Sequence, residues 1–203
     1  MPNWCNNTVE ISHEDPAKIQ ALAQALKAGE FCQHVIPTPK ELTDTVSGFM
    51  GEDQREAHEA QQKANLEKYG HTDWYSFQTS RWGTKWDVEC EDPQVDGNTL
   101  TAYFDSAWSP PIGVYQELVE QGYSVRAMYY EPGMAYAGVF EDGDDDYYEL
   151  GEMRSQQVRD ELPSDLDDAF GISEQMEEYE RENEEELTQW IREGAEERQK
   201  DES

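Results

Sequence analysis

Acidic residues crowd the end of this chain, and that uneven distribution limits where a hydrophobic core can form. The last 63 of the 203 residues contain 25 acids and 6 bases, whereas residues 1–140 contain 21 acids and 9 bases. Burying unpaired charge is costly, so the core must come from the earlier part of the chain. The sequence therefore predicts a folded domain over residues 1–150 and an acidic helical extension over residues 151–203.

The chain opens with a strand followed by a helix. In "CNNTVEISH", Val9 and Ile11 alternate with polar residues, which is the two-residue period of a half-buried strand. Asp15 and Pro16 then provide the N-cap and first turn of a helix with apolar residues at helical spacing, and Gly29 marks its end.

Residues from about 30 to 85 predict an insertion. Pro37 and Pro39 preclude a regular strand or helix through "HVIPTPKEL". Residues 52–69 contain strong helix formers with a thin apolar stripe, so we expect a helix on the outside of the domain. The stripe consists of Ala57, Ala60, Ala64 and Leu66.

The next elements complete a recognisable order. Residues 86–92 and 99–106 both alternate, and the Asp-Gly pair in the "PQVDGN" between them predicts a hairpin turn. A helix then runs from Ser109-Pro110-Pro111 to Gly122, and "YSVRAMYYE" follows as a strand. This βαββαβ order indicates an α+β, ferredoxin-like fold with an antiparallel sheet, which "EPGMAYAGVFEDGDDDYYEL" extends by a C-terminal hairpin.

After Gly151 the pattern becomes helical. A first helix ends before Pro163, and Ser164 is expected to cap a short helix over "DLDDAF". From Ser173 to about Lys200, the apolar residues are too sparse for a sustained coiled coil, which favours a helix docked weakly at both ends or partly disordered. Those apolar residues are Met176, Tyr179, Leu187, Trp190 and Ile191.

Four stretches give the chain a specific resemblance: "MPNWCNN" at the start, "WGTKWD" at 82–87, "FDSAWSPP" at 104–111 and "YYEPGMAYAG" at 129–138. Together they resemble the YubB-type ferredoxin-like proteins of plasmids, phages and other mobile elements, a domain family of unknown function. The match covers about residues 1–150 and implies a ferredoxin-like domain with an insertion before the second strand. It implies no reaction, cofactor or catalytic residue, and it does not extend to the acidic tail.

The stretch "SRWGTKWD" at residues 80–87 places two cations beside two indoles. The cations could bind a phosphate while the rings stack on a base. Alternatively, the rings pack as a corner of the fold and the cations neutralise nearby carboxylates, which is the interpretation we favour. Two further tryptophans flank strand ends of the same sheet, which makes this group the candidate pocket. Its residues are Trp4, Arg81, Trp82, Lys85, Trp86 and Trp108.

Several classes of site lack a sequence signal. The histidines and cysteines show no HExxH or CxxC pairing, and "EDGDDDYYE" does not match the twelve-residue calcium loop. No GxSxG elbow or glycine-rich phosphate loop occurs, so we predict no catalytic residue, metal or cofactor. Three widely spaced cysteines indicate buried reduced thiols. The lack of a long apolar run or export signal favours a cytoplasmic protein without membrane contact.

The net charge of −31 disfavours direct nucleic-acid binding, because phosphates would be repelled over most of the surface. The leading hypothesis is a non-enzymatic accessory protein of a phage or mobile element. Such a protein would be a monomer or weak dimer. It would block a basic nucleic-acid-binding or defence protein through a DNA-mimicking surface. Mimicry requires the acids of the hairpin turn, the tail and the insertion to combine on one side.

The alternatives are a salt-adapted domain without mimicry and a nucleotide-binding module or enzyme centred on the candidate pocket. The acidic residues assigned to the partner surface are Asp142, Asp144, Asp145, Asp146, Asp167, Asp168, Glu177, Glu178, Glu184 and Glu185.

Overall fold

The computed structural model describes the backbone of residues 3–201 and the side chains of residues 3–186 and 188–190. The chain divides into two compact units, Met1–Tyr147 and Tyr148–Ser203. Helices and an antiparallel sheet together give an α+β fold. Among the described helices, none combines the length and the apolar character that a bilayer crossing requires.

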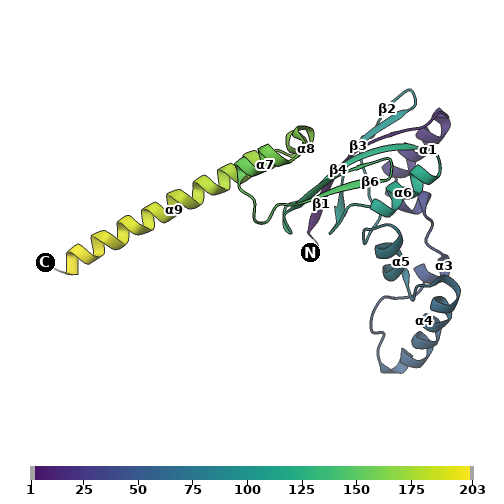
Figure 1. Ribbon diagram of the computed structural model, residues 1–203. Helices are drawn as coiled ribbons and strands as arrows, with labels where there is room; N and C mark the ends of the chain where they lie inside the picture. The colour runs from purple at the N-terminus through teal and green to yellow at the C-terminus, as the bar shows by residue number, and fades with distance from the viewer. Residues whose placement is uncertain (1–2, 202–203) are drawn as a thin grey trace. The chain divides into compact units, whose positions relative to one another are not determined.

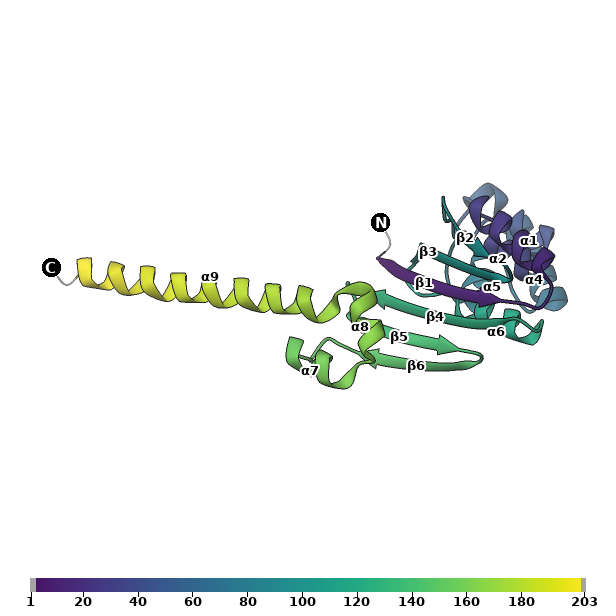
Figure 2. The ribbon, with the colours of Figure 1, turned by 90° about the horizontal axis from the view of Figure 1, so that it is seen from above.

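Six strands form one sheet in the order β2-β3-β1-β4-β5-β6 (Figure 2). Their bounds are β1 Trp4–Ser12, β2 Gln94–Asp96, β3 Thr99–Ala107, β4 Ser124–Glu131, β5 Tyr136–Glu141 and β6 Asp144–Glu149. The central strand β1 pairs antiparallel with β3 on one side and with β4 on the other. The predicted opening strand, the strand before Glu131 and the added hairpin are therefore confirmed.

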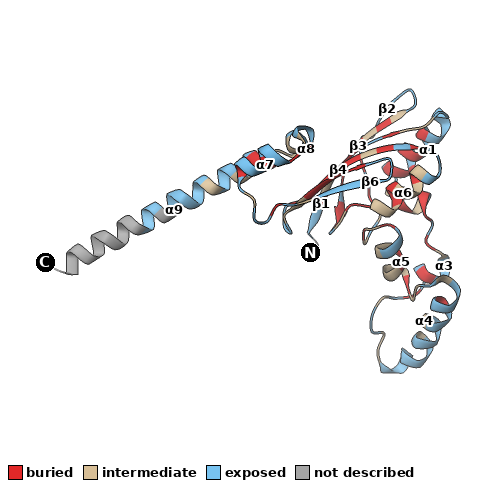
Figure 3. Cartoon of the chain, viewed as in Figure 1, coloured by how far each residue is buried: buried red, intermediate tan, exposed pale blue. Residues whose placement is uncertain are grey.

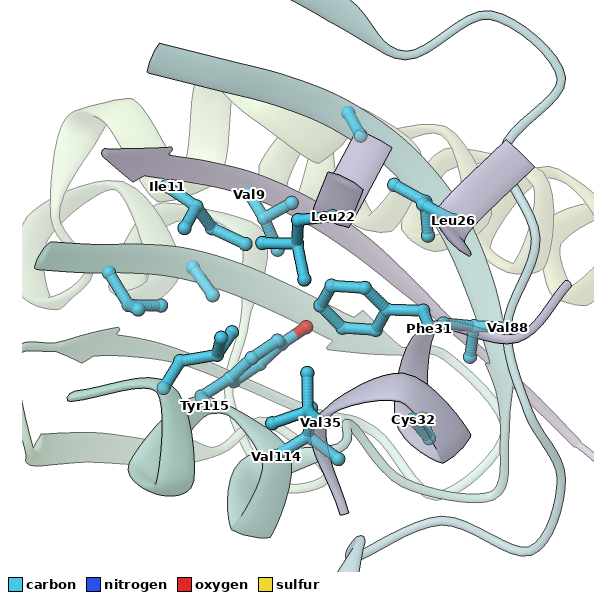
Figure 4. Packing of buried hydrophobic residues seen from close by; sticks show 14 of the residues in the cluster. Val9, Ile11, Leu22, Leu26, Phe31, Cys32, Val35, Val88, Val114 and Tyr115 are labelled. Atoms are coloured by element: carbon cyan, nitrogen blue, oxygen red, sulfur yellow. The ribbon is translucent and has the colours of Figure 1, made fainter. Parts of the chain in front are cut away.

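Helices α1 (Pro16–Lys27) and α6 (Ile112–Glu120) supply the core that covers one face of this sheet. In Figure 4, Val9 and Ile11 of β1 face Leu22 of α1 and Tyr115 of α6, and Phe31 of the short helix α2 (Phe31–Val35) fills the space between them. The Asp15 carboxylate accepts a hydrogen bond from the Ala17 backbone N–H at 2.9 Å, which confirms the predicted N-cap.

The predicted strand at residues 86–92 is wrong, although a hairpin turn is present at Gly97-Asn98, directly after Asp96. Residues 94–96 form the short strand β2, and residues 86–93 are irregular because their hydrogen bonds go elsewhere. The Asp87 carboxylate accepts hydrogen bonds from the backbone N–H groups of Cys32, Gln33 and Val88, and the Cys90 N–H donates to the Leu26 carbonyl. This segment therefore ties the ends of α1 and α2 together in place of a strand ladder.

The insertion contains more helix than the two prolines suggested. Helices α2 and α3 (Lys40–Thr43) flank Pro37 and Pro39. The 3-10 turn η1 (Glu52–Gln54), helix α4 (Arg55–Tyr69) and helix α5 (Trp74–Arg81) follow in chain order (Figure 1). Helix α5 was not predicted, yet Phe77 and the following Trp82 are part of the core.

Helix α4 is on the outside, as predicted, but its thin apolar stripe does not hold it in place. All four stripe residues are exposed, and Figure 3 shows most of this helix in the exposed colour. The buried residue of α4 is Asn65, whose side-chain amide donates to Thr45 Oγ1 and to the Thr72 carbonyl, both at 2.9 Å. The hydrogen-bonded side chain of Asn65 therefore anchors α4, whereas the sequence predicted that an apolar stripe would do so.

Replacing Asn65 by alanine is expected to destabilise α4 by about 1–3 kcal/mol, because Thr45 Oγ1 and the Thr72 carbonyl lose their buried donor. Native-state hydrogen exchange of the α4 amides will measure this loss. Leu66→Ala is the matched control: Leu66 is 52% exposed, so its change should stay within about 0.5 kcal/mol. A larger loss for Leu66→Ala than for Asn65→Ala would contradict the polar anchor.

The second unit consists of α7 (Ser155–Glu161), α8 (Ser164–Phe170) and α9 (Ile172–Asp201). Val158, Leu166 and Ile172 are buried, and Glu180 of α9 accepts hydrogen bonds from the Ser155 N–H and hydroxyl, both at 3.0 Å. The backbone hydrogen bond from Ser155, chiefly, holds the pKa of the Glu180 carboxyl below its ordinary value. These contacts join the start of α7 to α9.

One expectation for this unit is wrong, and the docking expected at both ends of the last helix is seen near its start, where Ile172 is buried and Glu180 bonds Ser155. Helix α8 begins at Ser164 itself, its cap position is Pro163, and no side chain among the described residues caps it. Tyr179 and Trp190 are 68% and 71% exposed, so neither docks α9. Leu187 and Ile191 lie outside the side chains that the structure describes.

Candidate functional site

Two loops meet at the N-terminal end of α6 and build the candidate pocket. Gly83 and Thr84 follow α5, and the segment Trp108–Pro111 follows β3. The Thr84 hydroxyl donates to the Ala107 carbonyl at 3.0 Å, and the Ser109 hydroxyl donates to the Gly83 carbonyl. Both hydroxyls thus cross-link the two loops, which positions Lys85 and Trp86 beside Trp108.

Lys85 lies against several aromatic rings. Its Nζ is 4.7 Å from the ring centroids of both Trp86 and Trp108, and 5.8 Å from that of Tyr75. Trp4 extends the group, with its ring centroid 6.2 Å from that of Trp86. We call Trp4, Tyr75, Trp86 and Trp108 the aromatic cluster. Its three tryptophans are 40–47% exposed, so the cluster presents indole surface to solvent around an ammonium group.

Trp108 has a backbone φ of +70°, a conformation that bulky side chains rarely adopt. Its N–H donates to the Asn3 carbonyl at 2.9 Å, and its own carbonyl accepts from the Tyr136 hydroxyl at 2.7 Å. Burial raises the pKa of Tyr136, so this hydroxyl remains a donor at neutral pH. The surrounding contacts hold a strained residue whose ring is 40% exposed, a combination that occurs at functional sites.

Arg81 and Trp82, the other two residues of the candidate pocket, have partners outside the aromatic cluster. Trp82 is 1% exposed, and its indole N–H donates to the Ile36 carbonyl at 2.8 Å. Arg81 lies 4.0 Å from Glu117 of α6, which is a loose ion pair. Trp82 is thus part of the core, whereas Trp4, Trp86 and Trp108 are exposed around the half-buried Lys85.

The acidic residues of the β5–β6 hairpin have two different roles. Asp142 accepts hydrogen bonds from the Val125 N–H at 2.7 Å and the Ser124 hydroxyl at 3.2 Å, which fixes the turn to β4. Asp145 accepts from the Tyr129 hydroxyl at 2.8 Å, and desolvation raises the pKa of its carboxyl. Asp144 and Asp146 are exposed, and within the described residues their side chains form no hydrogen bond or ion pair.

The assigned acids of the second unit also divide into two groups. Glu177 pairs with Arg159, Glu178 lies 3.4 Å from Arg181, and Asp167 accepts a hydrogen bond from the Ser173 N–H at 2.7 Å. Asp168, Glu184 and Glu185 are exposed, and their side chains have no partner in the described part of the chain. Half of this set is therefore available to a binding partner.

Sequence reasoning missed the aromatic residues that α5 contributes. The start of this helix carried a signal: Asp73 accepts a hydrogen bond from the Ser76 N–H at 3.0 Å, and the Ser76 hydroxyl lies against the Asp73 backbone in a capping box. The pair Asp73-x-x-Ser76 directly precedes Phe77. Recognising it would have placed Trp74 and Tyr75 on a helix next to the loop that carries Lys85.

The cysteines are buried thiols, and the described acids form no metal-binding group. Cys5, Cys32 and Cys90 are free and buried. Burial raises the pKa of the Cys5 thiol to about 12 and that of Cys32 well above its ordinary value, so both thiols stay protonated at neutral pH. Within the same residues, no group of three or more His, Cys, Asp or Glu side chains is placed to hold a metal ion.

Comparison with known proteins gives little further information. No family model matches the chain, and a search of curated proteins finds no significant match. Among solved structures, the chain is similar to that described as the crystal structure of a protein api92 from Yersinia pseudotuberculosis, family-model DUF1281. The identity is 12% and the TM-score 0.42, over 75% of this chain and 99% of that chain. A likeness at this level supports no conclusion about function.

Proposed function

We propose that this protein binds a basic, nucleic-acid-binding protein through the acidic surface of its second unit and thereby occupies the partner's nucleic-acid site. The proposal rests chiefly on one observation: residues 164–190 contain eleven acids and a single base, Arg181. Most of these acids are exposed. A surface of this kind attracts and orients a basic partner, and it repels nucleic acid itself.

The spacing of the charges supports mimicry of a single strand. Residues 172–190 of α9 rise by about 28 Å, at about 1.5 Å per residue. They carry eight acids and one base, net −7. One strand of B-DNA has a phosphate every 3.4 Å or so, which is about eight charges over the same length. The described part of α9 therefore approaches the linear charge density of one strand without help from the hairpin or the insertion.

The acids without an intramolecular partner lie together on this helix. Glu182, Glu184, Glu185 and Glu186 are exposed and form no ion pair within the described residues. Glu177 forms an ion pair with Arg159, and Glu178 forms one with Arg181, so their charges are partly neutralised. We therefore assign the centre of the binding surface to residues 182–186.

The first unit suits the same proposal as a scaffold. Its βαββαβ order and the arrangement β2-β3-β1-β4 within the sheet support assignment to the ferredoxin-like fold, with β5 and β6 as an added hairpin. Together with the YubB-type motifs of residues 1–150, this favours an accessory protein of a plasmid or phage. The proposed partner class implies a cytoplasmic location.

A charge-matched pair of variants tests the proposal. The first variant changes Glu182, Glu184, Glu185 and Glu186 to glutamine. The control changes four exposed acids of the first unit, Glu14, Glu56, Glu67 and Glu120, none of which has a side-chain partner in the described residues. Each variant neutralises four carboxylates, so the net charge changes equally. Both variants and the unmodified chain are compared by affinity capture from lysate of the source organism. Capture is carried out at about 0.1 M and about 1 M salt, with and without duplex DNA.

We expect the unmodified chain to capture a basic nucleic-acid-binding protein, which high salt or added DNA releases. The control variant should still capture this protein, and the α9 variant should not. Equal loss in both variants would show a response to total charge alone and contradict a defined surface. Capture of no basic protein at low salt would also contradict the proposal. If high salt then raised the unfolding midpoint of the unmodified chain, a salt-adapted domain would explain its acidity.

A further inference from the structure

A groove in the first unit lies beside Lys85 but has the opposite charge. Its volume is about 430 Å³, within the range of small-ligand sites. It is bordered by the residues around α2, by the end of α3, by α5 and by the loop after α5. The lining residues are Glu30, Gln33, Thr43, Trp74, Gln78, Trp82, Trp86 and Asp87.

Three indoles contribute to this groove, and two of them are held in place. Trp82 is fixed by its hydrogen bond to the Ile36 carbonyl, and Trp86 is fixed by its contacts with Lys85 and Trp4. Trp74, at the start of α5, is half-buried. The Trp86 ring already lies 4.7 Å from the Lys85 ammonium, so this indole accepts a cation against its ring.

The polar lining of the groove is acidic. Glu30 is exposed, and its side chain has no partner among the described residues. Asp87 is held in one position by the backbone N–H groups of Cys32 and Gln33, at 2.7 and 2.9 Å. Among the residues that the structure describes, no lysine or arginine lines the groove. Aromatic faces together with carboxylates attract a positive group that carries apolar surface, and the overall charge of −31 strengthens this preference.

We propose that this groove binds an organic cation, a guanidinium or quaternary ammonium group, between Trp74 and Trp86 with Glu30 as its counter-ion. An inorganic cation would leave the indole faces unused, and an anion would meet two carboxylates. The inference does not depend on the partner proposed for α9. The same cation chemistry could come from a free small molecule or from an arginine of another protein, and the probes below distinguish these sources.

The test follows the indole N–H resonances of the six tryptophans in the full-length, ¹⁵N-labelled protein. Choline is the probe for a free cation, and acetyl-Gly-Arg-Gly-amide is the probe for a protein side chain. The neutral citrulline analogue of that peptide, potassium chloride and adenosine monophosphate are the controls. We expect saturable shifts of the Trp74 and Trp86 signals with at least one cationic probe, and no shift of Trp190, which belongs to the second unit. Choline alone would indicate a free ligand, and the arginine peptide alone would indicate a protein partner.

Matched variants identify the residues responsible. Trp74→Ala is expected to raise the Kd of the cationic probe by about 2- to 30-fold, the range of one cation–π contact. Glu30→Gln should raise it by about 2- to 5-fold, because the ion pair is exposed. The controls Trp190→Ala and Glu14→Gln should leave it unchanged, and circular dichroism will check that each variant folds.

Three results would overturn the inference. The first is the absence of a saturable shift with both cationic probes. The second is equal binding of the citrulline peptide, which would show that the charge is not recognised. The third is saturable binding of adenosine monophosphate at Trp86 and Trp108, which would assign the region to an anion held by Lys85. Each result leaves the α9 proposal intact, because that proposal depends on different residues.

Discussion

Replacing Trp82 with alanine is expected to lower the free energy of unfolding by about 3–5 kcal/mol, the usual cost of removing a buried tryptophan side chain. Trp82 is 1% exposed and belongs to the main hydrophobic cluster. The substitution also removes the donor to the Ile36 carbonyl and leaves that carbonyl without its partner. Since natural domains have only about 5–15 kcal/mol of stability, this change could unfold the first unit at moderate temperature.

Trp86→Ala is the matched control, because it removes the same side chain four residues away. Trp86 is 40% exposed and contacts Trp4 and Lys85 through ring interactions, so we expect a loss of about 1 kcal/mol. Urea unfolding, followed by circular dichroism, measures the loss of stability in both variants. The slope m of the unfolding free energy against urea concentration checks that each variant exposes a similar surface on unfolding. Trp82→Phe should fall between them, because it retains most of the volume and loses the N–H donor. Similar losses for Trp82→Ala and Trp86→Ala would contradict the separation of core from surface in "SRWGTKWD".

Most of the sheet and both of its covering helices followed from the sequence, because they depend on local patterns. The alternation around Val9 and Ile11 and the Asp15-Pro16 start of α1 are short-range signals, and tertiary packing agrees with them. The strand assigned to residues 86–92 failed for a non-local reason. Its alternation is real, but Asp87 bonds the start of α2 and Cys90 bonds Leu26, more than 50 residues earlier in the chain.

The insertion shows a second limit of pattern reading. The apolar stripe of α4 was visible in the sequence, yet the helix is anchored by Asn65, whose partners Thr45 and Thr72 are loop residues. No periodicity identifies a polar anchor of this kind, because its stabilising effect depends on where the loops meet. The same holds for the candidate pocket. Its tryptophans were identified by type, but Tyr75, Trp74 and Glu30 join them only through the folded positions of α5 and α2.

Gly113→Ala provides the sharpest test of the packing around the two loops, because helix propensity predicts a gain in stability and packing predicts a loss. In an unhindered helix, replacing glycine by alanine stabilises by up to about 1 kcal/mol. Gly113 lies in the first turn of α6, where its N–H donates to the Trp82 carbonyl at 3.1 Å. A Cβ at this position would lie 2.1 Å from the Arg81 carbonyl oxygen and 2.9 Å from its carbon. Both are backbone atoms, so α6 and the end of α5 must move apart.

We therefore expect Gly113→Ala to destabilise the first unit by about 1–3 kcal/mol, the usual cost of overpacking, despite the gain in helix propensity. Glu120→Ala, at the exposed end of the same helix, should change stability by no more than about 0.5 kcal/mol. The displacement should also disturb the loop that carries Lys85 and Trp86, since Gly113 contacts the backbone of Arg81 and Trp82, directly before that loop. Shifted Trp86 and Trp108 indole resonances would report this in a protein that still folds. A stabilised Gly113→Ala protein with unchanged resonances would show that α5 and α6 are not in direct backbone contact, and the close approach that positions the aromatic cluster would then be wrong.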